Sequence, residues 1–294
     1  MALVPALAGQ PPGSWRVKKL PSLSNRVFRV TGTAGDYVLR LANEAPYLDR
    51  VRETHNHRLA AGICLAPPVL FDDPARGILL TAFQPQAATF DRKADRHRSI
   101  EAVARGLQRL HRSGLTFKGE MRLAPTMDEY LAIAGSVGQP VARVWTHWRP
   151  DIAPVLTRIE AQLVPSHVDP VPRNVLISHA DDGVAAQFVD WEYSAPAAPV
   201  WDLADFAIEA DLNREEEAVL LSAYGIGAGT GGEAAFHIYM PLLDLLAAAW
   251  AASQVALHGN RAEQEGMVES RLGRAKDALD RPGFDTSLAA FRAH

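Results

Sequence analysis

The sequence contains one cysteine, Cys64, among its 294 residues. A single cysteine excludes an internal disulfide framework and a metal centre built from several thiolates. The residues around Cys64 are apolar, so we expect its side chain to be buried as structural packing. Because such cysteine usage fits a reducing compartment, we expect a cytoplasmic protein.

The chain also lacks an excess of charge of either sign. Its 30 Lys and Arg residues nearly balance 34 Asp and Glu residues, and no long run of like charge occurs. No basic face is therefore available to attract nucleic acid, and we expect no nucleic-acid partner.

A long hydrophobic segment is missing from the start of the chain. Residues 1–13 are apolar and proline-rich, but they lack the basic start of a secretory signal and are too short to cross a bilayer. We expect no membrane association, and we expect residues 1–14 to be frayed.

Short β-branched and aromatic runs fill the first part of the chain. They predict strands at residues 15–20, 26–30, 36–41, 68–71 and 77–83. After the third run the pattern predicts a helix from Leu48 to Ala61, ended by Gly62. Three strands, one helix and two strands predict a small antiparallel-sheet lobe over residues 1–84.

The remainder, residues 85–294, has mainly helical patterns. The apolar spacing predicts helices at residues 99–111, 127–137, 141–163, 202–209 and 240–255, and a glycine-rich loop at 225–232. Pro150 and Pro154 predict a break or kink in the third of these. Asn213 and Glu216 are spaced as a capping box that begins another helix. With a composition of 48% hydrophobic and 22% charged residues, the chain is predicted to be a two-lobed α+β protein.

A polar cluster lies within this second part, from His167 to Asp190. Prolines exclude a helix between His167 and Asn174, and strands are predicted at residues 175–178 and 185–189 with a turn between them. This hairpin would bring Asp169, Asn174 and Asp190 to one end of a small ribbon. A carboxylate to deprotonate a hydroxyl, with an amide and a carboxylate to hold Mg²⁺, is a set that suits phosphoryl transfer.

Each of these residues also has a simpler interpretation. His-x-Asp alone is very common, and an Asn before a strand can cap a turn. Glu53, taken alone, is best interpreted as a solvated helix acid, and the turn at residues 21–25 as a surface hairpin. The combination of Asp169, Asn174 and Asp190 is what favours a functional site.

The same residues resemble a known family. His167-x-Asp169-x-x-x-x-Asn174, then Val189-Asp190-Trp191-Glu192-Tyr193 and Trp201-Asp202-Leu203-Ala204, are similar to motifs of the choline/ethanolamine kinase and aminoglycoside phosphotransferase superfamily. In the first lobe, Leu23-Ser24-Asn25-Arg26, Tyr37-Val38-Leu39-Arg40 and Leu48-Asp49-Arg50-x-x-Glu53 resemble the choline kinase branch. The resemblance covers about residues 15 to 255 and implies a two-lobed protein-kinase-like fold.

The resemblance also implies roles for individual residues. Asp169 would be the catalytic base, supported by His167, and Asn174 and Asp190 would hold Mg²⁺. Arg40 would take the place of the usual phosphate-binding lysine, with Glu53 as its ion-pair partner. The residues expected at the nucleotide, ATP, are Ser24, Asn25, Arg40, Glu53, Thr81 and Phe83. Asp202 is expected to be a buried acid that fixes the catalytic loop.

The acceptor side is implied by carboxylates and aromatic rings of the second lobe. Glu209 matches a carboxylate that faces the choline ammonium in the resembling family. Aromatic faces bind cations with about 0.5 to 2 kcal/mol each. The residues expected at the acceptor are Asp169, Glu192, Tyr193, Glu209 and Trp250. Core packing is an equal alternative for Trp250.

Two departures from the family pattern stand out. Leu20-Pro21-Ser22-Leu23 replaces a glycine-containing phosphate loop, and Val168 replaces an asparagine.

From the motifs and the resemblance we expect an ATP-dependent kinase, monomeric or homodimeric, that phosphorylates a small cationic amino alcohol such as choline or ethanolamine. Alternatives are an aminoglycoside or other antibiotic kinase, a nucleotide-binding regulator with little catalysis, and a metal-dependent hydrolase using His167, Asp169 and Asp190.

Overall fold

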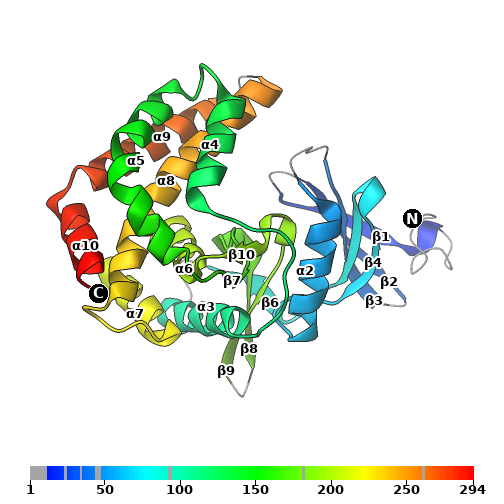
Figure 1. Ribbon diagram of the computed structural model, residues 1–294. Helices are drawn as coiled ribbons and strands as arrows, with labels where there is room; N and C mark the ends of the chain where they lie inside the picture. The colour runs from blue at the N-terminus through cyan, green and yellow to red at the C-terminus, as the bar shows by residue number, and fades with distance from the viewer. Residues whose placement is uncertain are drawn as a thin grey trace.

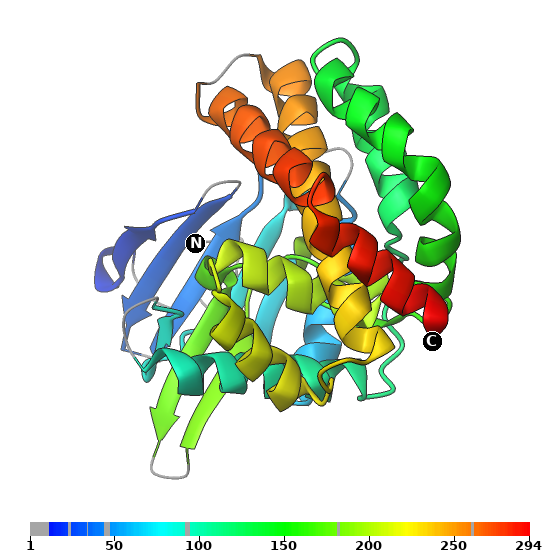
Figure 2. The ribbon, with the colours of Figure 1, turned by 90° about the vertical axis from the view of Figure 1, so that its left-hand side faces the viewer.

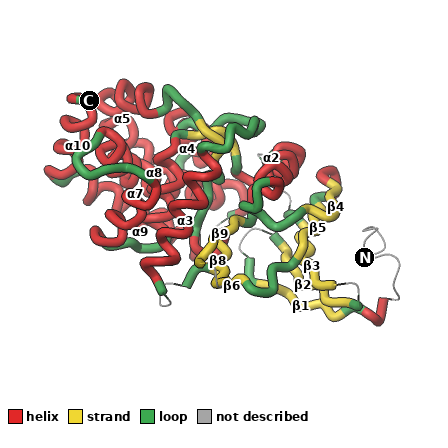
Figure 3. The backbone as a smooth tube through the Cα atoms, turned by 90° about the horizontal axis from the view of Figure 1, so that it is seen from below, coloured by secondary structure: helices red, strands yellow, loops and turns green. Residues whose placement is uncertain are grey.

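The computed structural model describes residues 12–22, 25–33, 35–43, 48–91, 95–180, 183–259 and 262–294. A small lobe built on a β-sheet lies beside a larger lobe made mainly of helices (Figure 1). Viewed from below, strands and helices are segregated along the molecule (Figure 3). The α+β class and the two-lobed architecture predicted from the sequence are confirmed.

The small lobe is a five-stranded antiparallel sheet in the order β1-β2-β3-β5-β4. Its strands are β1 (Arg16–Leu20), β2 (Arg26–Gly32), β3 (Gly35–Leu41), β4 (Val69–Asp73) and β5 (Ile78–Ala82). Short 3₁₀ turns, η1 (Pro12–Ser14) and η2 (Pro74–Arg76), precede β1 and β5. Trp15, Val30 and Leu80 are buried in a core of this lobe's own. All five predicted strands are thus present.

The α-helix that the structure describes in the small lobe, α2 (Arg50–Gly62), carries polar residues toward the large lobe. The Asp49 side chain caps it by accepting from the Val51 and Arg52 backbone N–H groups, which satisfies two otherwise unpaired donors. Nδ2 of Asn56 donates to the Ser194 carbonyl oxygen at 2.9 Å. The helix therefore docks on the loop that follows the predicted metal strand.

The predicted ribbon is the hairpin of β8 (Val175–Ala180) and β9 (Gly183–Phe188). A short strand that the sequence analysis missed, β6 (Ala87–Thr89), pairs with β8. The predicted catalytic loop lies between β7 (Val164–Ser166) and β8 and includes the turn η3 (Pro172–Asn174). After β9 the chain forms η4 (Trp191–Tyr193) and β10 (Ala195–Ala197), which pairs with β7.

Helices form most of the core of the large lobe. They are α3 (Arg96–His111), α4 (Leu123–Ala134), α5 (Gln139–Ile159), α6 (Pro199–Glu209), α7 (Arg214–Tyr224), α8 (Gly231–His258), α9 (Ala262–Leu279) and α10 (Pro282–Ala293). Gly106 lets α3 approach β9, since a Cβ there would lie 3.1 Å from the Phe188 ring. The long helix α8 runs through this lobe, with α9 and α10 crossing in front of it in Figure 2.

Helix α8 is long and apolar enough to cross a membrane by length and composition alone. However, 72% of its apolar window is buried inside the fold, as expected of a core helix.

Three sequence predictions need correction. Cys64 is exposed rather than buried, because it follows the end of α2 in a turn with a φ of 58°. Helix α5 continues through both Pro150 and Pro154, so of the predicted break or kink the break is absent. Helix α8 begins at Gly231, which shortens the predicted loop at residues 225–232.

Candidate active site

The catalytic loop brings two of the predicted residues into direct contact. Nδ2 of Asn174 donates to Oδ2 of Asp169 at 2.8 Å and to the Asp169 carbonyl oxygen at 3.0 Å. Burial raises the pKa of Asp169 despite the nearby Arg173, and the Asp190 carboxylate adds to the rise. The amide nitrogen of Asn174 is thus directed at Asp169, which leaves its amide oxygen as the atom able to ligate a cation.

The Asp202 carboxylate fixes the backbone of this loop through hydrogen bonds. Its carboxylate is fully buried and accepts from the backbone N–H groups of His167, at 2.8 Å, and Val168, at 2.7 Å. Nε1 of Trp201 donates to the Val168 carbonyl oxygen at 3.1 Å. These contacts agree with the role predicted for Asp202. They hold Val168 at a φ of 74°, a conformation unfavourable for a β-branched residue.

Two histidines support this arrangement. Nε2 of His167 donates to the Val189 carbonyl oxygen at 3.0 Å, and burial lowers the pKa of His167 to about 4, so the ring is neutral. His111 bridges Asp202, 3.0 Å from Nε2, and the Tyr224 hydroxyl, 2.8 Å from Nδ1. The sequence analysis assigned no partner to His111, because a lone histidine on a helix carries no signal for one.

An ion-pair network joins the two lobes behind the loop. Arg40 on β3 bonds to Glu53 on α2, and the same Nη1 lies 3.1 Å from Oδ1 of Asp190. Glu53 is only 1% exposed, so the predicted pairing is present and the solvated interpretation is wrong. Burial raises the pKa of Glu53, but Arg40 and Arg50 outweigh that effect and hold the pKa below its usual value. Burial opposes the charge on Arg40, but these carboxylates raise its pKa above the ordinary value.

The network continues to Glu192. Nη1 of Arg50 donates to Oε2 of Glu192 at 2.8 Å and to Oε2 of Glu53 at 3.0 Å. Nδ2 of Asn25, from the start of β2, donates to Glu192 at 3.0 Å. Glu192 was expected at the acceptor; the structure instead buries it between these two residues of the small lobe. The pairing of Glu53 with its neighbour Arg50 could be anticipated from their spacing, but the bond from Arg50 to Glu192 was not predicted, because Glu192 is 142 positions away in the chain.

Asn174 and Asp190 fit a magnesium site. Asp190 lies two residues beyond the end of β9 with a φ of 65°, and burial, together with Glu192, raises its pKa in spite of Arg40. Among the described residues, no group of three or more His, Cys, Asp or Glu side chains is suited to hold a metal. Mg²⁺ is commonly held by only one or two protein oxygens beside the phosphates of a nucleotide, so this small donor set is sufficient.

Three other residues were predicted at the nucleotide. Two of them lie on or next to β5 of the small-lobe sheet, and the third is not among the described residues. Thr81 is buried on β5, opposite Val38 of β3. Phe83 follows β5, and the Arg29 guanidinium lies 3.8 Å from the centre of its ring. Ser24 lies outside the described residues.

The residues predicted at the acceptor include an aromatic pair and a carboxylate. Nε1 of Trp250 on α8 donates to the Tyr193 hydroxyl at 3.2 Å, so these two predicted residues lie together. Glu209 ends α6 and bonds to Arg271 of α9. Oδ2 of Asp205, one turn earlier on α6, is buried without a hydrogen-bond partner in the described part of the chain. Burial raises the pKa of Asp205, and Asp169 and Glu209 add to the rise.

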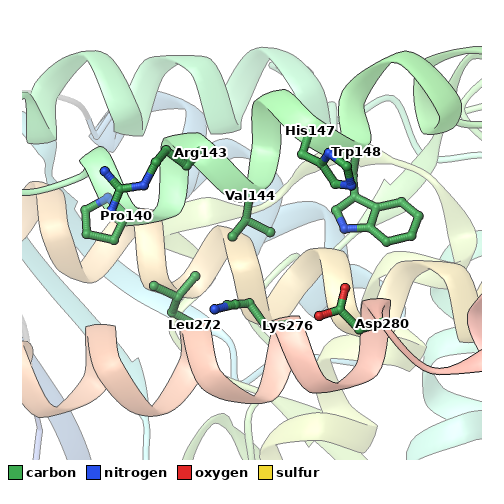
Figure 4. Close-up of a pocket in the computed structure, with 8 residues that line it drawn as sticks. All are labelled: Pro140, Arg143, Val144, His147, Trp148, Leu272, Lys276 and Asp280. Carbon is green, nitrogen blue, oxygen red and sulfur yellow. The ribbon is translucent and has the colours of Figure 1, made fainter.

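A separate pocket of about 300 Å³ lies between α5 and α9 (Figure 4). It is lined by Arg143, His147, Trp148 and Lys276, among others, and none of the predicted site residues lines it.

Comparisons with known proteins bear on the family and the fold. A model of the phosphotransferase enzyme family matches residues 16–242. Protein LicA from Haemophilus influenzae is 28% identical over 214 residues, which cover 68% of this chain and 75% of that protein. A solved choline/ethanolamine kinase family protein from Mesorhizobium loti has a TM-score of 0.83 and 29% identity, over 100% of this chain and 97% of that one. Choline kinase LicA from Streptococcus pneumoniae has a TM-score of 0.73 and 22% identity, with coverage of 90% and 92%.

Proposed function

The chain belongs to the phosphotransferase enzyme family, and from this we propose that it transfers the γ-phosphoryl group of ATP to a hydroxyl group of a small cationic amino alcohol, such as choline or ethanolamine. The observation that carries this proposal is the contact of Asn174 with Asp169 on a loop fixed by Asp202. A base and a metal ligand are thereby held next to each other on a rigid support.

Asp169, Asn174 and Asp202 would each have a different role in the transfer. Asp169 accepts the proton of the acceptor hydroxyl and orients its oxygen toward the phosphorus atom. Asn174 restrains the Asp169 carboxylate through its amide nitrogen. Asp202 restrains the backbone on which Asp169 lies, so that the carboxylate needs little rearrangement to reach its reacting position.

On the nucleotide side, Arg40 would contact the phosphate oxygens while Glu53 keeps its guanidinium in place. Asn174 and Asp190 would hold Mg²⁺, which supplies positive charge to the phosphates during transfer. Asp190 contacts Arg40 in the structure, so the residue that would hold the metal and the residue that would bind phosphate would face the same nucleotide.

On the acceptor side, Glu209 and the pair of Tyr193 and Trp250 support a cationic substrate. The ring faces attract an ammonium group, and the carboxylate supplies the compensating charge. The relatives named as choline or ethanolamine kinases support the same class of acceptor.

The test is a coupled assay of ATP consumption with choline, ethanolamine, thiamine and aminoglycosides as acceptors. Asp169→Asn should lower kcat on the best acceptor by about 10²- to 10⁴-fold, the contribution of general base catalysis. Asp128→Asn is the matched control, because Asp128 pairs with Arg149 on the surface of α4 and α5, away from the loop. Wild-type turnover by both Asp169→Asn and Asp190→Ala would refute the proposal, and transfer to aminoglycosides alone would replace the acceptor class.

A further inference from the structure

Arg271 on α9 contacts carboxylates from two other helices at the acceptor side. Its Nη1 donates to Oδ1 of Asp244 on α8 at 2.9 Å, and its Nη2 donates to Oε1 of Glu209 on α6. The side chains of Arg271 and Glu209 are 14% and 19% exposed, so the pair is largely removed from solvent. The carboxylate assigned to the acceptor's cation is therefore already neutralised by a cation of the same chain.

We propose that Arg271 is a tethered competitor of the acceptor: its guanidinium takes the place at Glu209 that the cationic group of the acceptor requires, and the acceptor displaces it. This inference rests on the proposed function, because it concerns the acceptor of that same site. It identifies Arg271 as a residue that determines specificity.

The geometry allows displacement at a modest cost. Arg271 uses different nitrogens for its two partners, so Nη2 can leave Glu209 while Nη1 stays on Asp244. Asp244 is held in addition by Arg274, which lies one turn further along α9. The guanidinium therefore has an anchored position to occupy after it leaves Glu209, and neither charge becomes buried without a partner.

The same geometry makes the site selective. A group tethered to the protein has a high effective concentration at its partner, in the millimolar range for short flexible links. A free cation must compete with it, and charge alone gives that cation no advantage. An alkylated ammonium that also contacts the rings of Tyr193 and Trp250 gains roughly 2- to 30-fold in affinity for each ring. The arrangement should thus favour a cation shaped to fit the aromatic pair.

Arg271→Gln tests the inference, with Arg274→Gln as the matched control. Arg274 carries the same charge on the same helix and bonds to the same Asp244, but it has no bond to Glu209 among the described contacts. Binding is measured by titration calorimetry without ATP, using choline, ethanolamine and the neutral choline isostere 3,3-dimethylbutan-1-ol. Arg271→Gln should bind the two cations roughly fivefold more tightly, since a partly exposed ion pair contributes up to about 1 kcal/mol. Arg274→Gln should bind them as the wild type does, and the neutral alcohol should bind all three proteins alike.

Several outcomes would overturn the inference. Equal gains in Arg271→Gln and Arg274→Gln would mean that a general change of charge, and not release of Glu209, controls binding. Unchanged, weaker or undetectable cation binding by Arg271→Gln would mean that Arg271 does not compete. If Arg271→Gln fails to fold, Arg271→Lys should show a smaller gain of the same sign.

The readout also separates this inference from the proposed function. Calorimetry needs no turnover, so tighter cation binding without phosphorylated product would support the competitor and refute the kinase. Phosphorylation of choline by the wild type, with no gain in Arg271→Gln, would support the kinase and refute the competitor.

Discussion

The Arg40 guanidinium lies 3.1 Å from the Asp190 carboxylate and bonds with the same nitrogen to Glu53. The residue proposed to bind phosphate is therefore paired with the residue proposed to hold Mg²⁺. Because the first comes from the small lobe and the second from the large lobe, their contact also fixes how the lobes meet. Nucleotide phosphates would bind next to Arg40 and Asp190, whose relative position is already fixed by their contact.

The first prediction concerns Arg40. Arg40→Ala should raise KM for ATP about tenfold or more, since a hydrogen bond to a charged group contributes about 1.5–3 kcal/mol. KM for the acceptor should change little, because Arg40 lies on the nucleotide side. Steady-state kinetics with each substrate varied in turn provide the measurement. Lys18→Ala, on an exposed position of β1, is the control. An unchanged KM for ATP in Arg40→Ala would remove Arg40 from the phosphate site.

The second prediction concerns stability and Arg50, which bonds to both Glu53 and Glu192. Arg50→Ala should lower the free energy of unfolding by about 3 kcal/mol, because it leaves two buried carboxylates short of positive charge. Urea unfolding measures the change. Arg58→Ala is the control on the same helix: Arg58 is 50% exposed and pairs with Asp72, so its loss should cost less than about 1 kcal/mol.

A double-mutant cycle tests directly whether Arg50 and Glu192 are energetically coupled. Combining Arg50→Ala with Glu192→Gln should cost less than the sum of the two single changes, because removing both charges leaves less unpaired charge behind. Strict additivity would show that the two residues are not coupled and that Arg50 does not stabilise the junction of the lobes.

Features encoded by local pattern were predictable from the sequence. The five strands of the small lobe follow from alternating runs and turn residues, and the ribbon of β8 and β9 follows from Pro172, the apolar runs and Gly183. The capping box of Asn213 and Glu216 is present as predicted. The spacing of Asp169, Asn174 and Asp190 was enough to place them near one another, because one short hairpin separates the loop from Asp190.

Features that depend on distant partners were not predictable. By its local pattern Glu53 looks like any acid on the first turn of a helix; its pairing with Arg40 was predicted only through the family resemblance, and the bond of Arg50 to the distant Glu192 was not predicted. Asn25 was expected at the nucleotide on resemblance, but its partner Glu192 is 167 positions away. Arg271 lies in a helix that the sequence analysis did not describe. In each case the role comes from the packing of two elements, which no local period encodes.

The third prediction concerns the support of the catalytic loop. Asp202→Asn should lower kcat at least tenfold with little change in either KM, because an amide can no longer accept from His167, Val168 and His111 together. The loop would then lose part of the restraint that aligns Asp169. Steady-state kinetics give the split between kcat and KM, and melting temperature shows whether the variant is folded. A folded Asp202→Asn protein with wild-type kcat would contradict this role.

The last prediction is a loss of stability in mild acid that originates at His57. Burial lowers the pKa of His57 to about 4, against 6.5 for the ordinary side chain, so the native ring is neutral at neutral pH. Its Nε2 donates to the Pro67 carbonyl oxygen at 2.8 Å, and Nδ1 has no partner in the described part of the chain. Between pH 6.5 and 4 the unfolded chain binds a proton that the native protein does not. The free energy of unfolding must therefore fall as the pH falls through that window, by about 3 kcal/mol in total from this group.

His57→Gln isolates that contribution, because a glutamine can keep a donor toward Pro67 and does not titrate. The stability of the wild type relative to His57→Gln, measured by urea unfolding at several pH values, should decrease as the pH drops from 6.5 to 4, because only the wild type loses this contribution. His179→Gln, at an exposed position of β8, is the control and should leave the pH dependence unchanged. A His57→Gln protein that loses stability in acid as steeply as the wild type would mean that the protons are taken up elsewhere. His167 would then be the next group to test, since burial also lowers its pKa to about 4.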